Sequence, residues 1–162
     1  MERRFKSDTM NAVANSTVLI LLAKTNRFDL LKNKYRNVFI TQIIKEEITR
    51  KDLIIKREIN KFLKIKNPKQ MLKLRLDKGE ESAISLASEI KLNFLSDDKK
   101  ARLAARTLKI NVLGTVGILF WNLKRKNINK KEFIELLHAL IKKGFYISAE
   151  LYSNIVKTLD DY

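Results

Sequence analysis

The sequence predicts an α/β fold in which a parallel sheet carries helical crossovers on both faces. Short apolar runs alternate with stretches of helical spacing, which is typical of strands joined by helices. The 162 residues include only four Gly and one Pro, too few for the tight turns of an all-β fold. With 45% hydrophobic and 32% charged residues, the composition excludes intrinsic disorder. At this length we expect one domain spanning residues 1–162.

The strands are predicted where β-branched, aromatic and other apolar residues form short runs. The first run is buried in character, and each later run follows a helical stretch. The expected strands are 12–15, 37–41, 92–96, 110–113 and a short one at 145–147.

The helices are predicted where apolar residues recur every three or four positions after a capping residue. Ser16 or Thr17 would cap the first helix, Asp97 or Asp98 a central one, and Gly144 would end the eighth. The expected helices are 18–24, 27–35, 43–49, 51–66, 80–90, 99–108, 115–126, 130–143 and one after Ser148. The fourth is basic and amphipathic, with Ile54, Ile55, Ile59, Phe62 and Leu63 on one side.

The net charge is +16, from 34 Lys and Arg against 18 Asp and Glu, and it favours a polyanionic partner. The alternative is a solvated lysine-rich surface. Residues 51–78 hold ten basic and three acidic residues, and residues 124–131 hold five basic and no acidic residues. RNA is the first expectation for these surfaces, a protein partner or second copy the next, and a membrane the last. The candidate nucleic-acid contacts are Lys56, Arg57, Lys61, Lys64, Lys99 and Lys100.

Several function classes are excluded by what the sequence lacks. Without Cys and with one His, disulfide scaffolds, thiol catalysis and multi-histidine zinc sites are ruled out. The sequence from Gly114 to Gly117 matches neither phosphate-binding glycine motif, so we expect no nucleotide cofactor. The apolar run 18–23 is far shorter than the ~20 residues that span a membrane. We therefore expect a cytoplasmic protein without a membrane segment.

Acidic residues follow the predicted strand ends, where parallel sheets bind ligands. Asp97 and Asp98 are adjacent after the third strand, and such a pair needs a cation or a helix N-terminus nearby. Glu46, Glu47, Glu80 and Glu81 lie on neighbouring helices. Each could be a cap or a surface charge alone, but together they predict a Mg²⁺ site for phosphodiester hydrolysis.

Four stretches together resemble the PIN-domain family of metal-dependent nucleases, which includes VapC-type toxin ribonucleases. They are VANSTVLILLAKTNRFDLLKNKYRNVFITQIIKEEI, LDKGEESAISLA, NFLSDDKKARLAARTLKINVLGTVGIL and GFYISAELYSNIVKTL, and they are spread from residue 13 to residue 159, nearly the whole chain. The resemblance implies a three-layer α/β/α sandwich with a parallel sheet of about five strands. It also implies a hydrolase that cleaves RNA with Mg²⁺ or Mn²⁺, in some relatives a toxin bound by an antitoxin, and often a homodimer.

The resemblance places the family's acidic positions at Asn15, Glu47, Glu80 and Asp98, with Asp97 beside the last. Catalysis would rest on Glu47, Glu80 and Asp98, and the metal on Glu80, Asp98, Asp97 and Asn15. Asn15 and Ser16 would position phosphate or water. The departure is Asn15, because an amide offers a carbonyl oxygen but no charge. The alternative expectation is therefore a weak or inactive RNA-binding or regulatory member of the family.

Overall fold

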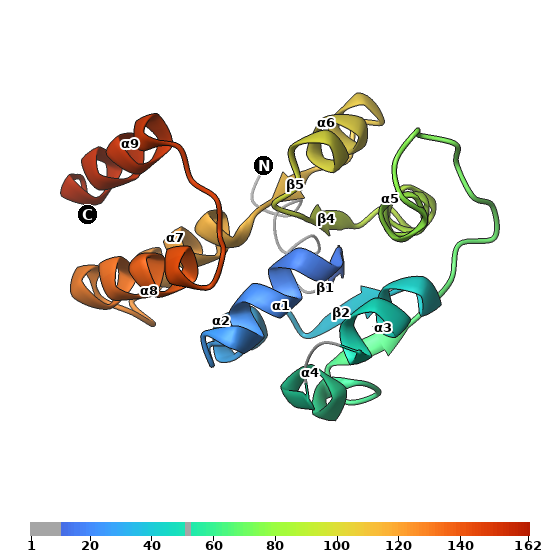
Figure 1. The fold of residues 1–162 in the computed structure, drawn as a ribbon, viewed down its shortest axis with the longest axis horizontal. Coiled ribbons are helices and arrows are strands. Elements are labelled where there is room, and N and C mark those ends of the chain that lie inside the picture. Colours follow the sequence, from blue (N-terminus) through green and yellow to red (C-terminus); the bar gives the residue numbers. More distant parts are fainter. Residues whose placement is uncertain (1–10, 51–52) are drawn as a thin grey trace.

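The computed structural model describes residues 11–50 and 53–162, and its centre is a five-stranded parallel sheet (Figure 1). The strands lie in the order β3-β2-β1-β4-β5, with β1 in the middle. This confirms the predicted α/β class and the parallel sheet. The bounds are β1 Asn11–Ala14, β2 Asn37–Ile40, β3 Leu63–Ile65, β4 Asn93–Leu95 and β5 Val112–Leu113.

The central strand is covered on both faces. Ala12 pairs with Val38 of β2 on one side and with Asn93 of β4 on the other. Ala12, Val13 and Ala14 are completely buried. The sequence of a strand that is buried on both faces is a continuous apolar run, because no side chain of the strand faces water.

Nine helices among the described residues surround the sheet. Helices α1, α3 and α4 pack against one another, and α5 packs against α6. Right-handed crossovers in this strand order place α1–α4 and α5–α6 on opposite faces, which gives the expected three layers. The bounds are α1 Ser16–Lys24, α2 Asp29–Lys34, α3 Gln42–Thr49, α4 Leu53–Glu58, α5 Lys78–Ile90, α6 Lys99–Thr107, α7 Thr115–Lys124, α8 Lys130–Lys142 and α9 Ala149–Asp160.

The predicted basic helix over residues 51–66 is wrong in its second half. Helix α4 ends at Glu58, and Asn60 has a left-handed φ of 68° that a continuing helix would not adopt. Residues 63–65 then form β3 at the edge of the sheet, where Leu63 is fully buried and pairs with Val38. Residues 51 and 52 lie outside the described part of the chain.

The predicted strand at 145–147 is a loop. Gly144 has φ +100° and ends α8, as expected. The Phe145 N–H donates to the Leu140 carbonyl at 3.0 Å, and the Gly144 N–H donates to the Ile141 carbonyl at 3.1 Å. These two bonds complete a Schellman motif, so the backbone of Phe145 closes the helix instead of extending the sheet.

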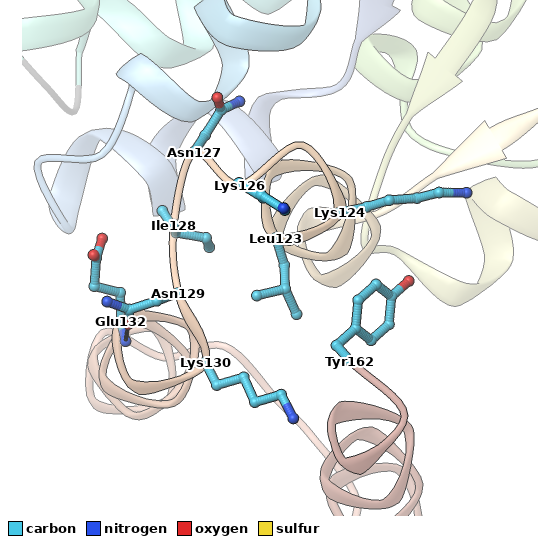
Figure 2. A pocket seen from close by; sticks show the side chains of 9 residues that line it. All are labelled: Leu123, Lys124, Lys126, Asn127, Ile128, Asn129, Lys130, Glu132 and Tyr162. Atoms are coloured by element: carbon cyan, nitrogen blue, oxygen red, sulfur yellow. Dashed lines mark hydrogen bonds between the residues drawn. The ribbon is translucent and has the colours of Figure 1, made fainter.

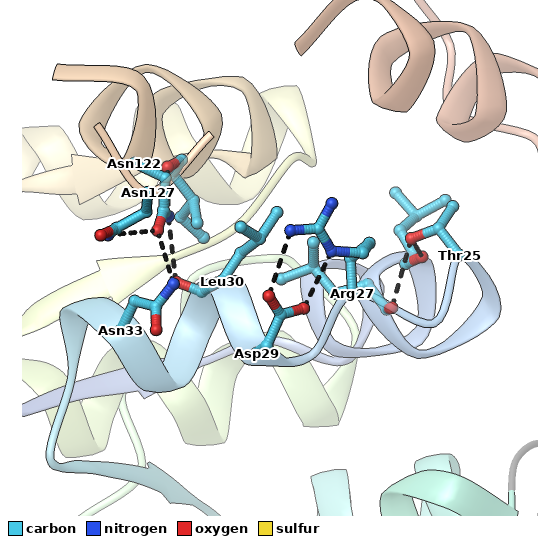
Figure 3. Close-up of polar contacts among 10 residues, drawn as sticks. Thr25, Arg27, Asp29, Leu30, Asn33, Asn122 and Asn127 are labelled. Atoms are coloured by element: carbon cyan, nitrogen blue, oxygen red, sulfur yellow. Dashed lines mark hydrogen bonds and ion pairs between the residues drawn. The ribbon is translucent and has the colours of Figure 1, made fainter. Parts of the chain in front are cut away.

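A buried asparagine ties α2 to α7 (Figure 3). Asn122 is fully buried, and its Nδ2 donates to the Leu30 carbonyl at 3.0 Å and the Ile118 carbonyl at 2.9 Å. Its Oδ1 accepts from Asn33 and Asn127, each at 3.0 Å. The network joins the first crossover to the C-terminal helices. Within the described ranges, no helix is both long and apolar enough to cross a membrane.

Candidate active site

From β1 the chain adds β2 and β3 on one side of the sheet and then β4 and β5 on the other side. Such a switch in strand order leaves a crevice between the carboxyl ends of the two strands where it occurs, here β1 and β4. Asn15 follows β1 and Ser96 follows β4, and both are buried. The Asn15 N–H donates to the Leu95 carbonyl at 2.8 Å, and Asn15 Nδ2 donates to Ser96 Oγ at 3.3 Å. The Oδ1 of Asn15 accepts the Ser16 N–H at 2.9 Å and caps α1, a role predicted for Ser16 or Thr17.

Asp98 stands directly beside this pair. Its N–H donates to Ser96 Oγ at 3.1 Å, so Asn15, Ser96 and Asp98 form one hydrogen-bonded chain. Its Oδ1 accepts the Ala101 N–H at 2.8 Å and caps α6, one of the two caps expected there. The second carboxylate oxygen of Asp98 accepts no hydrogen bond from the described residues and can bind a ligand.

Glu47 and Glu80 come together where α3 meets the first turn of α5. The Glu47 carboxylate lies against Gly79, and a Cβ on Gly79 would overlap its Oε1 and come within 3.2 Å of Ile44 Cδ1. Gly79 lies inside α5, behind the N-cap Asp77, whereas the sequence placed it ahead of the helix. The missing side chain of Gly79 therefore leaves room for Glu47 beside Glu80.

Three other carboxylates, those of Asp77, Asp98 and Glu47, lie near enough to Glu80 for their charges to raise its pKa. Burial first, and then the charges of Asp77, Asp98 and Glu47, together raise the pKa of Glu80 to about 7, against a backbone hydrogen bond with Asp77 that lowers it. Three ion pairs occur among the described residues, and none involves Glu47, Glu80 or Asp98. We call these three residues the carboxylate cluster. Among the described residues no cationic side chain pairs with this cluster; only the N-terminal ends of α5 and α6 offset its charge.

Asp97 faces away from the cluster. Its Oδ1 accepts the Thr115 N–H at 2.8 Å and its Oδ2 accepts the Thr115 hydroxyl at 2.5 Å. Burial raises the pKa of Asp97, whereas the bonds to Thr115 and the charge of Arg102 act in the opposite direction. The side chain thereby fastens the end of β4 to the start of α7.

The cluster offers the donors that Mg²⁺ or Mn²⁺ prefers, namely carboxylates with an amide carbonyl, Asn15, nearby. In the side-chain arrangement described, however, no three His, Cys, Asp or Glu residues of residues 11–50 and 53–162 lie close enough to share one ion. Glu80 is partly exposed, so its side chain can turn without breaking the core. The donor set fits a divalent cation in chemistry and neighbourhood, and such a turn is needed to complete the coordination.

The predicted RNA-contacting residues fall into two places. Lys99 and Lys100 follow Asp98 in the first turn of α6, and both are exposed. Lys56 and Arg57 lie on α4, and Lys61 precedes β3, so these residues lie toward the amino ends of the strands. Lys64 lies on β3 itself, and its Nζ donates to the Asn60 carbonyl at 3.1 Å. Only the first group adjoins the carboxylate cluster.

Two of the hollows outside the cluster have basic walls. One of about 500 Å³ is bounded by the end of α7, the turn into α8 and Tyr162 (Figure 2). It carries three lysines and a single acid, Glu132, so it is not a second carboxylate site. The other, of about 440 Å³, lies beside Asp97 and contains Arg102 and Arg106, which the sequence analysis did not single out.

Comparison with known proteins found a family model that matches the sequence and a solved structure that is similar to the fold. A family model described as PIN domain matches residues 11–161. The structure is similar to that of a PilT N-terminus domain protein from the hyperthermophilic archaeon Sulfolobus solfataricus P2, with a TM-score of 0.52 and 20% identity over 70% of this chain and 94% of that one. At this identity the likeness shows the fold alone. No match was found among curated proteins.

Proposed function

The chain belongs to the PIN-domain family, and from this premise we propose that it is a Mg²⁺-dependent endoribonuclease that hydrolyses phosphodiester bonds in RNA. The family commonly comprises nucleases that depend on divalent metals. The observation that carries the proposal is the position of Glu47 against Gly79, next to Glu80 in the first turn of α5, with Asp98 at the end of β4 near enough for its charge to act on Glu80. Mn²⁺ would fit the same donors.

Each side chain has a role that its surroundings support. Glu80 and the second oxygen of Asp98 would hold the cation, with Glu47 and Asn15 in support. A bound cation would neutralise charge on the phosphate and make a water more acidic. Before a cation binds, burial and the neighbouring carboxylates raise the pKa of Glu80 to about 7, and a bound cation would favour the charged carboxylate that serves as its ligand.

The remaining predicted site residues would position substrate or support the site. Ser16 lies in the first turn of α1, where helix N–H groups favour an anion such as phosphate. Asp97, whose oxygens both accept hydrogen bonds from Thr115, would hold the strand end in place instead of binding metal. Lys99 and Lys100 would attract the RNA backbone, because they are exposed cations directly beside Asp98.

The test is RNA cleavage in Mg²⁺ or Mn²⁺ by matched variants. Asp98→Asn keeps an equally good helix cap but removes the charge, so we expect folding to persist and cleavage to fall about 100-fold or more. Glu47→Gln should also reduce cleavage, whereas Glu46→Gln, on the exposed neighbour, should not. Unchanged cleavage by Asp98→Asn and Glu47→Gln would refute the assignment.

A second function is favoured by Asn15. Its amide donates to Ser96 Oγ, a role that a carboxylate cannot take, and it lowers the negative charge of the site. The chain would then be a non-catalytic RNA-binding or regulatory protein. Asn15→Asp separates the two: a gain of cleavage indicates a weakened nuclease, and salt-dependent RNA binding without turnover in either form indicates the binding protein.

The proposal also includes a toxin role with an antitoxin protein as partner, which rests on the family resemblance. Expression of the chain alone should then arrest growth, and Asp98→Asn should relieve the arrest. Arrest that persists with Asp98→Asn would argue against a toxin acting through this site. A homodimer remains a prediction that sedimentation of the purified chain can test.

A further inference from the structure

The hollow of about 440 Å³ lies at the edge of the sheet where β5 has no further strand beside it. It is lined by residues of α6, β5, the start of α7, the loop between α8 and α9, and α9; Figure 1 shows where these elements lie. This volume is within the range of pockets that bind small ligands, about 300–1,000 Å³. We name it the basic hollow, after the residues of its α6 wall.

One wall of the basic hollow is a stripe of cations. Lys99, Arg102 and Arg106 line it, and their spacing of three and four residues places them on one face of α6. No ion pair among the described residues involves them. Burial lowers the pKa of Arg102 and so does the charge of Arg106, whereas the charge of Asp97 raises it, and one guanidinium nitrogen of Arg102 donates to the Ser96 carbonyl at 3.1 Å. The charge of Arg106 still acts unfavourably on Arg102, and an anion bound between the two guanidinium groups would relieve that repulsion.

The opposite wall is aromatic, and one of its rings, that of Tyr146, is open to solvent. Phe120, Phe145 and Tyr146 line it together with Leu151. Tyr146 is 87% exposed and Leu151 is 44% exposed, so neither contributes much to the core. Nucleic-acid bases stack on such side chains without a requirement for a particular base, whereas phosphates bind the cations.

The position of the basic hollow links it to the carboxylate cluster. Asp97 lines the hollow, Asp98 belongs to the cluster, and Lys99 follows on the same helix. At a rise of 1.5 Å per residue, Lys99 and Arg106 lie about 10 Å apart along α6. The hollow and the cluster therefore lie on either side of the turn from β4 into α6, and a strand that leaves the cluster can follow α6 into the hollow.

We propose that the basic hollow binds one nucleotide of single-stranded RNA adjacent to the cleaved phosphate, with its base against Tyr146 and its phosphate against Arg102 and Arg106. The inference rests on the proposed function and names a binding site for its substrate. Positive charge beside the exposed ring of Tyr146 favours a nucleotide, and the adjoining carboxylate cluster favours RNA over a protein ligand.

The experiment measures binding of a labelled single-stranded RNA pentamer to the full chain by fluorescence anisotropy, in EDTA to prevent turnover. Tyr146→Ala should weaken binding about tenfold, because stacking on an aromatic ring is lost, whereas Tyr146→Phe should bind like the unaltered chain. With a pentamer that lacks its bases, Tyr146→Ala should have no effect.

The phosphate contact is tested with a pair of charge variants. Arg106→Gln should weaken binding and reduce the slope of log affinity against log salt by about 0.7, as expected for one lost phosphate contact. Lys24→Gln, at the end of α1 that points away from the site, removes the same charge and should change neither.

The outcomes separate this proposal from the nuclease proposal. If Tyr146→Ala and Arg106→Gln bind RNA normally, the basic hollow is not a nucleotide site, even if the chain cleaves RNA. If the chain cleaves no RNA in Mg²⁺ or Mn²⁺ but both variants lose affinity, the nucleotide site stands and the nuclease proposal fails. Variants that keep RNA affinity but lose a co-purifying protein would make the hollow a protein interface and overturn the proposal.

Discussion

Gly79 has no side chain at the point where α3 and α5 meet, and this decides where Glu47 can lie. Most helix positions gain about 1 kcal/mol when Gly is replaced by Ala, because the unfolded chain loses freedom. Here the added methyl would occupy the space of the Glu47 carboxylate. Function and helix propensity therefore favour different residues at this position.

We expect Gly79→Ala to separate stability from activity. The Glu47 side chain is flexible and can move aside, so the melting temperature should change by only about 2–4 °C in either direction. Cleavage should fall about tenfold or more. In the Glu47→Gln background, Gly79→Ala should cause little additional loss, since both substitutions remove the same carboxylate from the cluster. Additive losses would contradict this.

The raised pKa of Glu80 predicts a pH-dependent difference in stability. A carboxyl whose pKa rises from 4.5 to about 7 on folding stabilises the fold below pH 4.5, and this contribution is lost as the pH rises through 7. In EDTA, Glu80→Gln should match the unaltered chain near pH 4.5 and melt higher above pH 7. Since Glu80 is partly exposed, solvent screening limits the gain to about 1 kcal/mol, or 2–4 °C. A difference that does not vary with pH would count against the cluster.

Asp97 and Asp98 show which properties of single residues can be predicted from the sequence and which cannot. Asp97 and Asp98 both follow a strand, and the strand-end rule places them correctly at the sheet edge. It does not predict that Asp97 turns to Thr115 while Asp98 remains beside Glu80, because that depends on α7, a distant segment. The contact of Glu47 with Gly79 also depends on the packing of α3 on α5, which spacing alone does not reveal.

At the scale of elements, Asn122 holds α7 against α2 through four hydrogen bonds. Asn122→Ala would leave the Leu30 carbonyl and two amides without this partner in a buried position. We expect a loss of about 1–3 kcal/mol in the free energy of unfolding, measured by urea denaturation. Asn33→Ala should cost less, because Asn33 is exposed and provides one of the four bonds. Equal losses would mean that the network does not act through its buried centre.

The fold elements that sequence predicts best are those with a cap and a clear period, such as α8 with Asn129 and Gly144. Strand β3 is missed because Phe62 and Leu63 also fit the helical spacing that begins at residue 54. The alternation of Leu63, Lys64 and Ile65 is the signal for a strand, but three residues are too few to outweigh that spacing. Its pairing with β2 decides the outcome.

The whole molecule has a net charge of +16. It also contains the carboxylate cluster, which forms no ion pair among the described residues. We expect RNA binding to depend strongly on salt. Four phosphate contacts, from Lys99, Lys100, Arg102 and Arg106, would weaken binding about 50-fold between 50 and 200 mM salt, as estimated for single strands. Anisotropy titrations over this range check the value, and a slope near zero would show that the lysines only solvate the surface.

The central claim is that the side chains of Glu47, Glu80 and Asp98 converge on one divalent cation at the carboxyl edge of the sheet. Anomalous diffraction from crystals grown with Mn²⁺ tests this most directly. We predict one strong peak within bonding distance of Glu80 and Asp98, with Glu47 and Asn15 around it, and its loss in Asp98→Asn. A peak elsewhere, or none at millimolar Mn²⁺, would contradict the account.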